Sequence, residues 1–108
     1  MTITDKSPKR FRFTLTSRLQ NYALDIIEKL YLANEVYVRN GDVGKAAERL
    51  HLQHEAMTRI KMLAYVAQLA AEQDCILHRQ FELISRQCYD CQNLLGAWIN
   101  SDRRRLSK

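Results

Sequence analysis

Helix-breaking and turn-forming residues are scarce in this sequence, which has three glycines and one proline among its 108 residues. Such a composition excludes long flexible linkers and folds rich in β-turns. No apolar run approaches the roughly 20 residues that a membrane-spanning helix requires, and the N-terminal segment lacks the apolar stretch of a secretory signal. Together with three scattered cysteines, which suit reduced thiols, these absences predict one cytoplasmic domain that does not enter a membrane.

Motifs for catalysis are also absent. The sequence has no glycine-rich phosphate loop, no Gly-x-Ser-x-Gly segment and no carboxylate pair in an evident cleft. We therefore expect no enzyme activity, no catalytic residue and no cofactor.

Two short pairs, Cys88-x-x-Cys91 and His51-x-x-His54, have the spacing of zinc ligands. If the chain turns back near residue 75, however, residue n lies opposite residue 151 − n, and Cys91 faces Ile60 rather than a histidine. The offset is about six residues, on the order of 9 Å along a helix axis, against a metal–ligand bond of about 2 Å. We therefore expect no metal site, and two buried cysteines that act as small apolar side chains.

Apolar residues recur in steps of three and four along three segments, which is the pattern of amphipathic helices. The steps cover residues 15–37, 43–71 and 81–98. Thr14 and Asp42 are suitable N-caps for the first two segments, and Asn40–Gly41 is a suitable stop for the first. The pattern predicts an all-α fold, an up-down-up antiparallel bundle of three helices of roughly 25 to 30 residues each.

The net charge of +5 is concentrated at the two chain ends. Residues 1–13 and residues 101–108 each carry a net charge of +3, which leaves −1 for the residues between them. We divide the chain into a basic N-terminal tail (1–13), a helical domain (14–101) and a basic C-terminal tail (102–108). In an up-down-up bundle the two tails leave opposite ends, which suits an extended polyanion. The candidate nucleic-acid contacts are Lys9, Arg10, Arg12, Arg103, Arg104, Arg105 and Lys108.

Each basic cluster also has a simpler interpretation, as a solubilising tail. Arg103–Arg105 follow a helix C-terminus, where the helix dipole favours cations in any protein. Arg10 and Arg12 instead precede a helix N-terminus, where the dipole disfavours cations, so their presence favours phosphate contacts. We expect the aromatic residues between them to lie in a loop that leads into the helix, with Phe13 packed on the first turn as a hydrophobic staple.

Several segments resemble one known family. PKRFRFTL at 8–15 resembles a loop and helix start of that family, and LDIIEKLYLAN at 24–34 resembles its second helix. RQFELI at 79–84 resembles its Gln-Tyr-Glu helix start, and LLGAWIN at 94–100 resembles its Leu-Gly-Gly-Trp-Ile-Lys ending. By these segments the chain resembles the accessory variability determinant family of diversity-generating retroelements. Members of that family are similar to four-helix-bundle proteins encoded in intervening sequences of ribosomal RNA genes.

The resemblance implies a four-helix-bundle-like fold whose first helix is missing, because only seven residues precede PKRF. It also implies a homo-oligomer, a ring-like pentamer in the family, that contacts a reverse transcriptase and binds nucleic acid through positive surfaces. The chain would then be a non-catalytic accessory subunit that binds template RNA and the polymerase. Two alternatives stay open: a helical protein–protein scaffold with no nucleic-acid role, and a ribosomal-RNA-associated four-helix-bundle protein.

A missing helix has a structural consequence. Three helices that fit a four-helix pattern leave a lengthwise groove, and soluble monomers rarely expose an apolar surface of that size. The first helical segment also has apolar residues outside its main stripe, including Ala23, Ile27, Tyr31 and Leu32. We therefore expect the chain to self-associate or to depend on a partner. The competing expectation is a compact three-helix bundle whose broad apolar faces close on each other.

Overall fold

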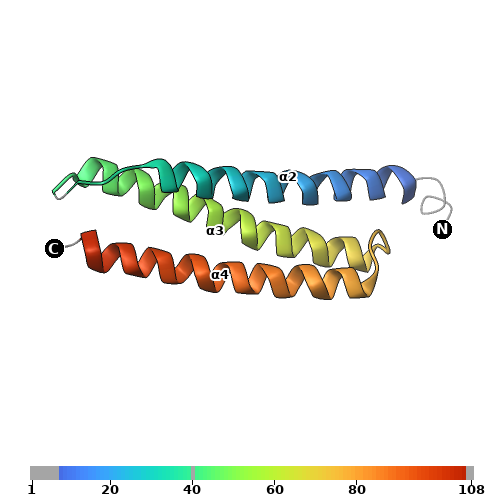
Figure 1. Cartoon of the computed structure of the whole chain (residues 1–108). Coiled ribbons are helices and arrows are strands. Elements are labelled where there is room, and N and C mark those ends of the chain that lie inside the picture. Colours follow the sequence, from blue (N-terminus) through green and yellow to red (C-terminus); the bar gives the residue numbers. More distant parts are fainter. Residues whose placement is uncertain (1–7, 40, 107–108) are drawn as a thin grey trace.

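The computed structural model of the chain describes residues 8–39 and 41–106, with side chains for residues 13–39 and 41–105. It has three helices: α2 (Pro8–Glu35), α3 (Val43–Glu72) and α4 (His78–Leu106). They run up, down and up, and no strand occurs among the described residues (Figure 1). The predicted all-α architecture of three long helices is therefore confirmed. In the part of the chain that the structure describes, no helix has the length and apolar character that a membrane span needs.

Helix α2 begins earlier than the sequence pattern predicts. Pro8 opens it, and proline suits the first turn because the N–H that it lacks has no helical partner there. The segment that we expected to be a loop is therefore the first part of a helix, and the boundary at residue 13 falls inside α2. Phe13 is 72% exposed, so the predicted hydrophobic staple is wrong. At the other end of the chain, α4 likewise continues past the predicted domain boundary at residue 101.

For the turn between α2 and α3, one prediction from the sequence is wrong and one is confirmed. Helix α2 ends at Glu35, ahead of the predicted stop at residues 40–41. Gly41 instead supplies a positive φ of 86° within the turn, a conformation that glycine adopts at little cost. Asp42 caps α3 as predicted, because its Oδ1 accepts a hydrogen bond from the backbone N–H of Lys45 at 3.0 Å.

Helix α3 lies between α2 and α4 and packs against both (Figure 1). Among the described residues, no Cα atom of α2 comes within 8 Å of a Cα atom of α4. The molecule is therefore an elongated, open arrangement of helices that measures 61 × 20 × 17 Å. The competing expectation of a compact, closed three-helix bundle is wrong.

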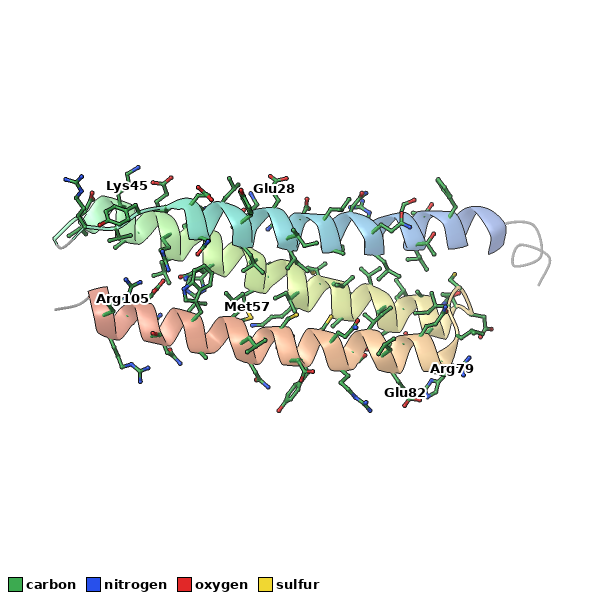
Figure 2. All side chains as sticks on the ribbon, in the orientation of Figure 1. Glu28, Lys45, Met57, Arg79, Glu82 and Arg105 are labelled. Atoms are coloured by element: carbon green, nitrogen blue, oxygen red, sulfur yellow. The ribbon has the colours of Figure 1, made fainter. Side chains whose placement is uncertain are left out.

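Two groups of buried side chains hold the outer helices to α3. The larger group draws on all three helices and consists of Ile26, Ala56, Ile60, Cys88, Leu95 and Ile99. The smaller group joins the first turns of α2 to the last turns of α3 and consists of Leu15, Val66 and Ala70. Met57, which packs on the larger group, lies between α3 and α4 in Figure 2. The core therefore follows α3 along its length and leaves the far sides of α2 and α4 uncovered.

Candidate nucleic-acid interface and interhelical groove

The three arginines that the sequence predicts to contact nucleic acid lie on the last turn of α4. Arg103, Arg104 and Arg105 are all exposed, at a helix end whose dipole favours cations. Figure 2 shows Arg105 at this end of α4, and Arg79 and Glu82 at its opposite end. The structure thus gathers three guanidinium groups within one helical turn at one end of the bundle.

The other predicted contacts lie at the edge of the described residues or beyond it. Lys9, Arg10 and Arg12 belong to the first turns of α2, but their side chains lie outside the described part. Lys108 lies outside the described residues altogether. The start of α2 and the end of α4 are at opposite ends of the bundle (Figure 1). The two basic segments are therefore separated, as the up-down-up topology predicts.

Arg105 belongs to a polar cluster that sequence reasoning missed, formed by Asp102, Arg49, Gln53 and Arg105. Asp102 is only 5% exposed, and three side chains donate hydrogen bonds to its carboxylate. Arg49 Nε lies 2.7 Å from Oδ2, Gln53 Nε2 lies 2.9 Å from Oδ2, and Arg105 Nη2 lies 2.7 Å from Oδ1. This Asp102 cluster joins the start of α3 to the end of α4.

Arg49 extends the Asp102 cluster to the end of α2 and to an aromatic ring. Its Nη1 donates a hydrogen bond to the backbone carbonyl oxygen of Val36, one residue past α2, at 3.3 Å. Its Cζ also lies 4.9 Å from the centroid of the Trp98 ring, a distance at which a guanidinium gains cation–π attraction. One side chain therefore joins α3 to α4 and to the residue that follows α2.

The ionisation of Asp102 follows from two opposed effects. Burial alone would raise its pKa, because burial penalises the charged carboxylate. The hydrogen bonds from Arg105, Arg49 and Gln53 outweigh burial and hold the pKa of Asp102 below its ordinary value. Asp102 is thus a carboxylate at neutral pH, and it offsets part of the positive charge at this end. Arg105 is held by this internal carboxylate as well as being exposed to solvent.

The turn near residue 75 is the sequence feature from which the Asp102 cluster could have been predicted. The relation that excluded a zinc site, with residue n opposite residue 151 − n, also places Arg49 opposite Asp102. Opposite charges at facing positions on neighbouring helices indicate an ion pair. The count of charge by chain segment hid this pair, because it added Asp102 to the C-terminal segment and Arg49 to the central segment.

A groove runs along the side of the molecule on which α2 and α4 stand apart. It contains two adjoining hollows, which share Cys91 as a lining residue. The first has walls from α2 and α4 and a floor from α3, with Ala23, Ile27, Ile60, Leu63 and Ile84 among its lining residues. The second is lined by Leu30, Asn34, Cys91, Leu94, Leu95 and Trp98. The structure thus has an open apolar groove of the kind that a missing fourth helix implies.

The α2 wall of the groove is free of charged residues. Uncharged residues recur along α2 in steps of three and four. They form one strip, the α2 strip, which consists of Phe13, Thr16, Gln20, Ala23, Ile27, Leu30 and Asn34. Four members of this α2 strip line the two hollows: Ala23, Ile27, Leu30 and Asn34. Leu24 and Tyr31 lie beside the strip and are 64% and 67% exposed. An uncharged helix face with several large apolar side chains in contact with solvent is unusual for a soluble monomer.

The cysteines divide between the core and the groove. Cys88 is buried, and burial raises the pKa of its thiol, with a further contribution from Cys91. Cys91 is exposed, so the prediction that both thiols are buried is wrong. Its position on the apolar row of α4 faces the open groove, where no helix covers it. Among the described side chains, no group of three or more His, Cys, Asp and Glu is placed to hold a metal ion.

Comparison of the chain with models of protein families, with curated proteins and with solved structures gives no match.

Proposed function

We propose that this chain is a non-catalytic accessory subunit that binds RNA through its basic ends. Support comes from the exposed arginines on the last turn of α4, which is the single observation that carries the proposal. Arginine is the side chain best shaped for paired hydrogen bonds to a phosphate group, and it stays charged at any physiological pH. A helix end with three such groups is a surface to which a polyanion binds.

The separation of the basic segments indicates the shape of the ligand. The molecule is 61 Å long, and its two basic segments lie at opposite ends (Figure 1). A small anion reaches only one of them, whereas an extended strand reaches both. This geometry favours a nucleic acid over a small phosphorylated ligand.

RNA binding is tested with a double substitution, Arg103→Ala with Arg104→Ala. Arg105 is left in place because it donates a hydrogen bond to Asp102. We expect weaker binding to single-stranded RNA, and a slope of log affinity against log salt that is smaller by about 1 to 2 than for the unaltered protein. Fluorescence anisotropy of a labelled RNA between about 50 and 200 mM salt measures this slope.

The matched control is Arg79→Ala with Arg86→Ala, which removes the same charge from two exposed positions elsewhere on α4. We expect this control to keep most of its affinity and both variants to keep their helicity by circular dichroism. An unchanged affinity of the Arg103/Arg104 variant at low salt would contradict the proposal. So would an equal loss in the control, because it would show that only net charge matters.

The proposed protein partner is a reverse transcriptase. Support for this part is the resemblance of the four segments, and it is tested separately from RNA binding. Genes that neighbour this one should encode a reverse transcriptase that co-purifies with the chain when both are expressed together. If neighbouring genes encode no such enzyme, the reverse transcriptase partner loses its support while RNA binding keeps its own.

A second candidate function is a helical protein–protein scaffold with no nucleic-acid role. The groove between α2 and α4 favours it, because exposed apolar surfaces of this kind mark interaction sites. No binding to RNA at low salt, combined with stable association of this chain with itself or with another protein, would select this candidate.

A further inference from the structure

The chain exposes more surface than a compact protein of its size. Its accessible surface is 8092 Å², whereas a compact protein of 12.7 kDa exposes about 6,200 Å². Its radius of gyration is 17.5 Å, against about 13 Å for a compact chain of this length. The elongated outline accounts for part of the excess of about 1,900 Å², but a standard interface removes only about 800 Å² from each partner. A stable interface therefore fits within this excess.

Exposed apolar side chains gather along α2, beside the groove. Leu24, Ile27 and Tyr31 are each more than 60% exposed, and Ile27 also lines the groove. The α2 strip continues this uncharged face over most of the helix. The chain thus presents both halves of one contact, an uncharged apolar ridge on α2 and an apolar groove next to it.

The charges of α2 are divided between its two halves. The first half holds four cations and no acid: Lys9, Arg10, Arg12 and Arg18. The second half holds Asp25, Glu28 and Glu35 against Lys29, which is already paired with Glu55 of α3 at 3.2 Å. Two parallel α2 helices would place like charges together, whereas two antiparallel α2 helices place each basic half against an acidic half. Charge therefore favours an antiparallel pair.

We propose that two copies of this chain form a two-fold symmetric dimer in which α2 of each copy lies antiparallel in the groove of the other. Each α2 then packs on α3 of its own chain and on α2 and α4 of the second copy, which covers Leu24, Ile27 and Tyr31. A two-fold contact uses the same surface on both copies and closes at two chains, in contrast to the five-chain ring that the resemblance implies. The dimer does not rest on RNA binding, although it sets three candidate RNA contacts, Lys9, Arg10 and Arg12, against the acidic half of the second copy's α2.

Sedimentation equilibrium across nanomolar to micromolar concentrations tests the dimer. We expect the full chain to reach twice its 12.7 kDa mass. Ile27→Glu places a carboxylate within the apolar part of the contact and should raise the dimer dissociation constant by at least about 30-fold. The matched control is Tyr65→Glu, at a position on α3 that is equally exposed, at 63%, and that lines neither hollow. This control should leave the dimer unchanged.

Charge reversal tests the antiparallel arrangement. Glu28→Arg with Glu35→Arg makes both halves of α2 basic, and Arg10→Glu with Arg12→Glu removes the basic excess of the first half. Each of these variants should dimerise more weakly than the unaltered chain, and an equimolar mixture of the two should dimerise more strongly than either variant alone, because one basic half again lies against an acidic half.

Three results would overturn the proposal. The first is a 12.7 kDa monomer at every concentration, which would leave the groove to a helix from a different protein. The second is a stable mass of five chains. The third is a dimer that Ile27→Glu weakens no more than Tyr65→Glu does, which would place the contact outside the groove.

Discussion

The Asp102 cluster and the groove lie along the same helix, α4. They differ in how much of their polar or apolar surface finds a partner within one chain. In the cluster, a carboxylate that is 5% exposed receives hydrogen bonds from three side chains of the same chain. In the groove, Leu94 of α4 and Ile27 of α2 line the two hollows and remain 72% and 63% exposed. The Asp102 carboxylate finds its partners within one chain, whereas the apolar side chains of the groove stay uncovered.

This difference follows from the unequal penalties for the two kinds of surface. A buried charge without a partner costs several kcal/mol, so the chain cannot fold around Asp102 unless its donors are in place. An apolar side chain left in water only forgoes a stabilisation of about 25 cal/mol per Å². A single chain can therefore fold with an open groove, and a neighbour can supply the missing burial afterwards.

The largest expected effect comes from breaking the Asp102 cluster. Asp102→Ala leaves Arg49, whose side chain is 12% exposed, without its carboxylate, and the loss of one partner from a buried pair costs about 3–5 kcal/mol. Urea unfolding followed by circular dichroism measures the change. Asp90→Ala, at an exposed position on α4, is the matched control and should change the free energy of unfolding by no more than about 0.5 kcal/mol. Similar changes in the two variants would contradict the stabilising role of the cluster.

The same variant has a second readout in acid. The pKa of Asp102 is lower in the folded chain, so its ionic contribution is present above the ordinary aspartate pKa of about 4 and is lost as the pH falls through the folded value. The unaltered protein should therefore lose stability in this acid range faster than Asp102→Ala does. Parallel losses in the two proteins would show that Asp102 titrates alike in the folded and unfolded chain.

Alanine substitutions at two isoleucines compare the stability of the closed core with that of the open groove. Ile60 is 1% exposed, and Ile60→Ala should cost about 2–5 kcal/mol at any protein concentration. Ile27 is 63% exposed, so Ile27→Ala should cost less than about 1 kcal/mol in dilute protein. The cost of Ile27→Ala should then grow with concentration, because association stabilises the folded chain by mass action. Urea unfolding at a low and a high protein concentration checks both variants, and a large, concentration-independent loss for Ile27→Ala would show a groove closed within one chain.

Local features of this fold could be predicted from the sequence. The rows that contain Leu15, Ile60 and Leu95 follow from steps of three and four, and the cap at Asp42 depends only on a hydrogen bond to the residue three positions ahead. The start of α2 was missed because alternating cations and aromatics obscure the periodic pattern, although Pro8 marks a suitable first turn.

Features that depend on how helices are arranged could not be predicted in the same way. Cys88 and Cys91 both belong to the apolar row of α4, yet only Cys88 is buried. Periodicity identifies the face of a helix but not whether a neighbour covers it, and here α2 stands too far from α4 to cover Cys91. The Asp102 cluster could be predicted in part, because the facing positions of α3 and α4 already pair Arg49 with Asp102.

The central claim is that the groove is open in one chain and filled when two chains meet, and the alkylation rate of Cys91 tests it most directly. Cys91 is an exposed thiol that lines both hollows, whereas Cys88 is buried and its raised pKa further slows its reaction. Mass spectrometry of the alkylated peptides gives both rates at increasing protein concentration. We predict that Cys91 reacts quickly in dilute protein and becomes protected over the concentrations at which the mass doubles, while Cys88 stays slow throughout. A Cys91 rate that is the same at every concentration would contradict the account.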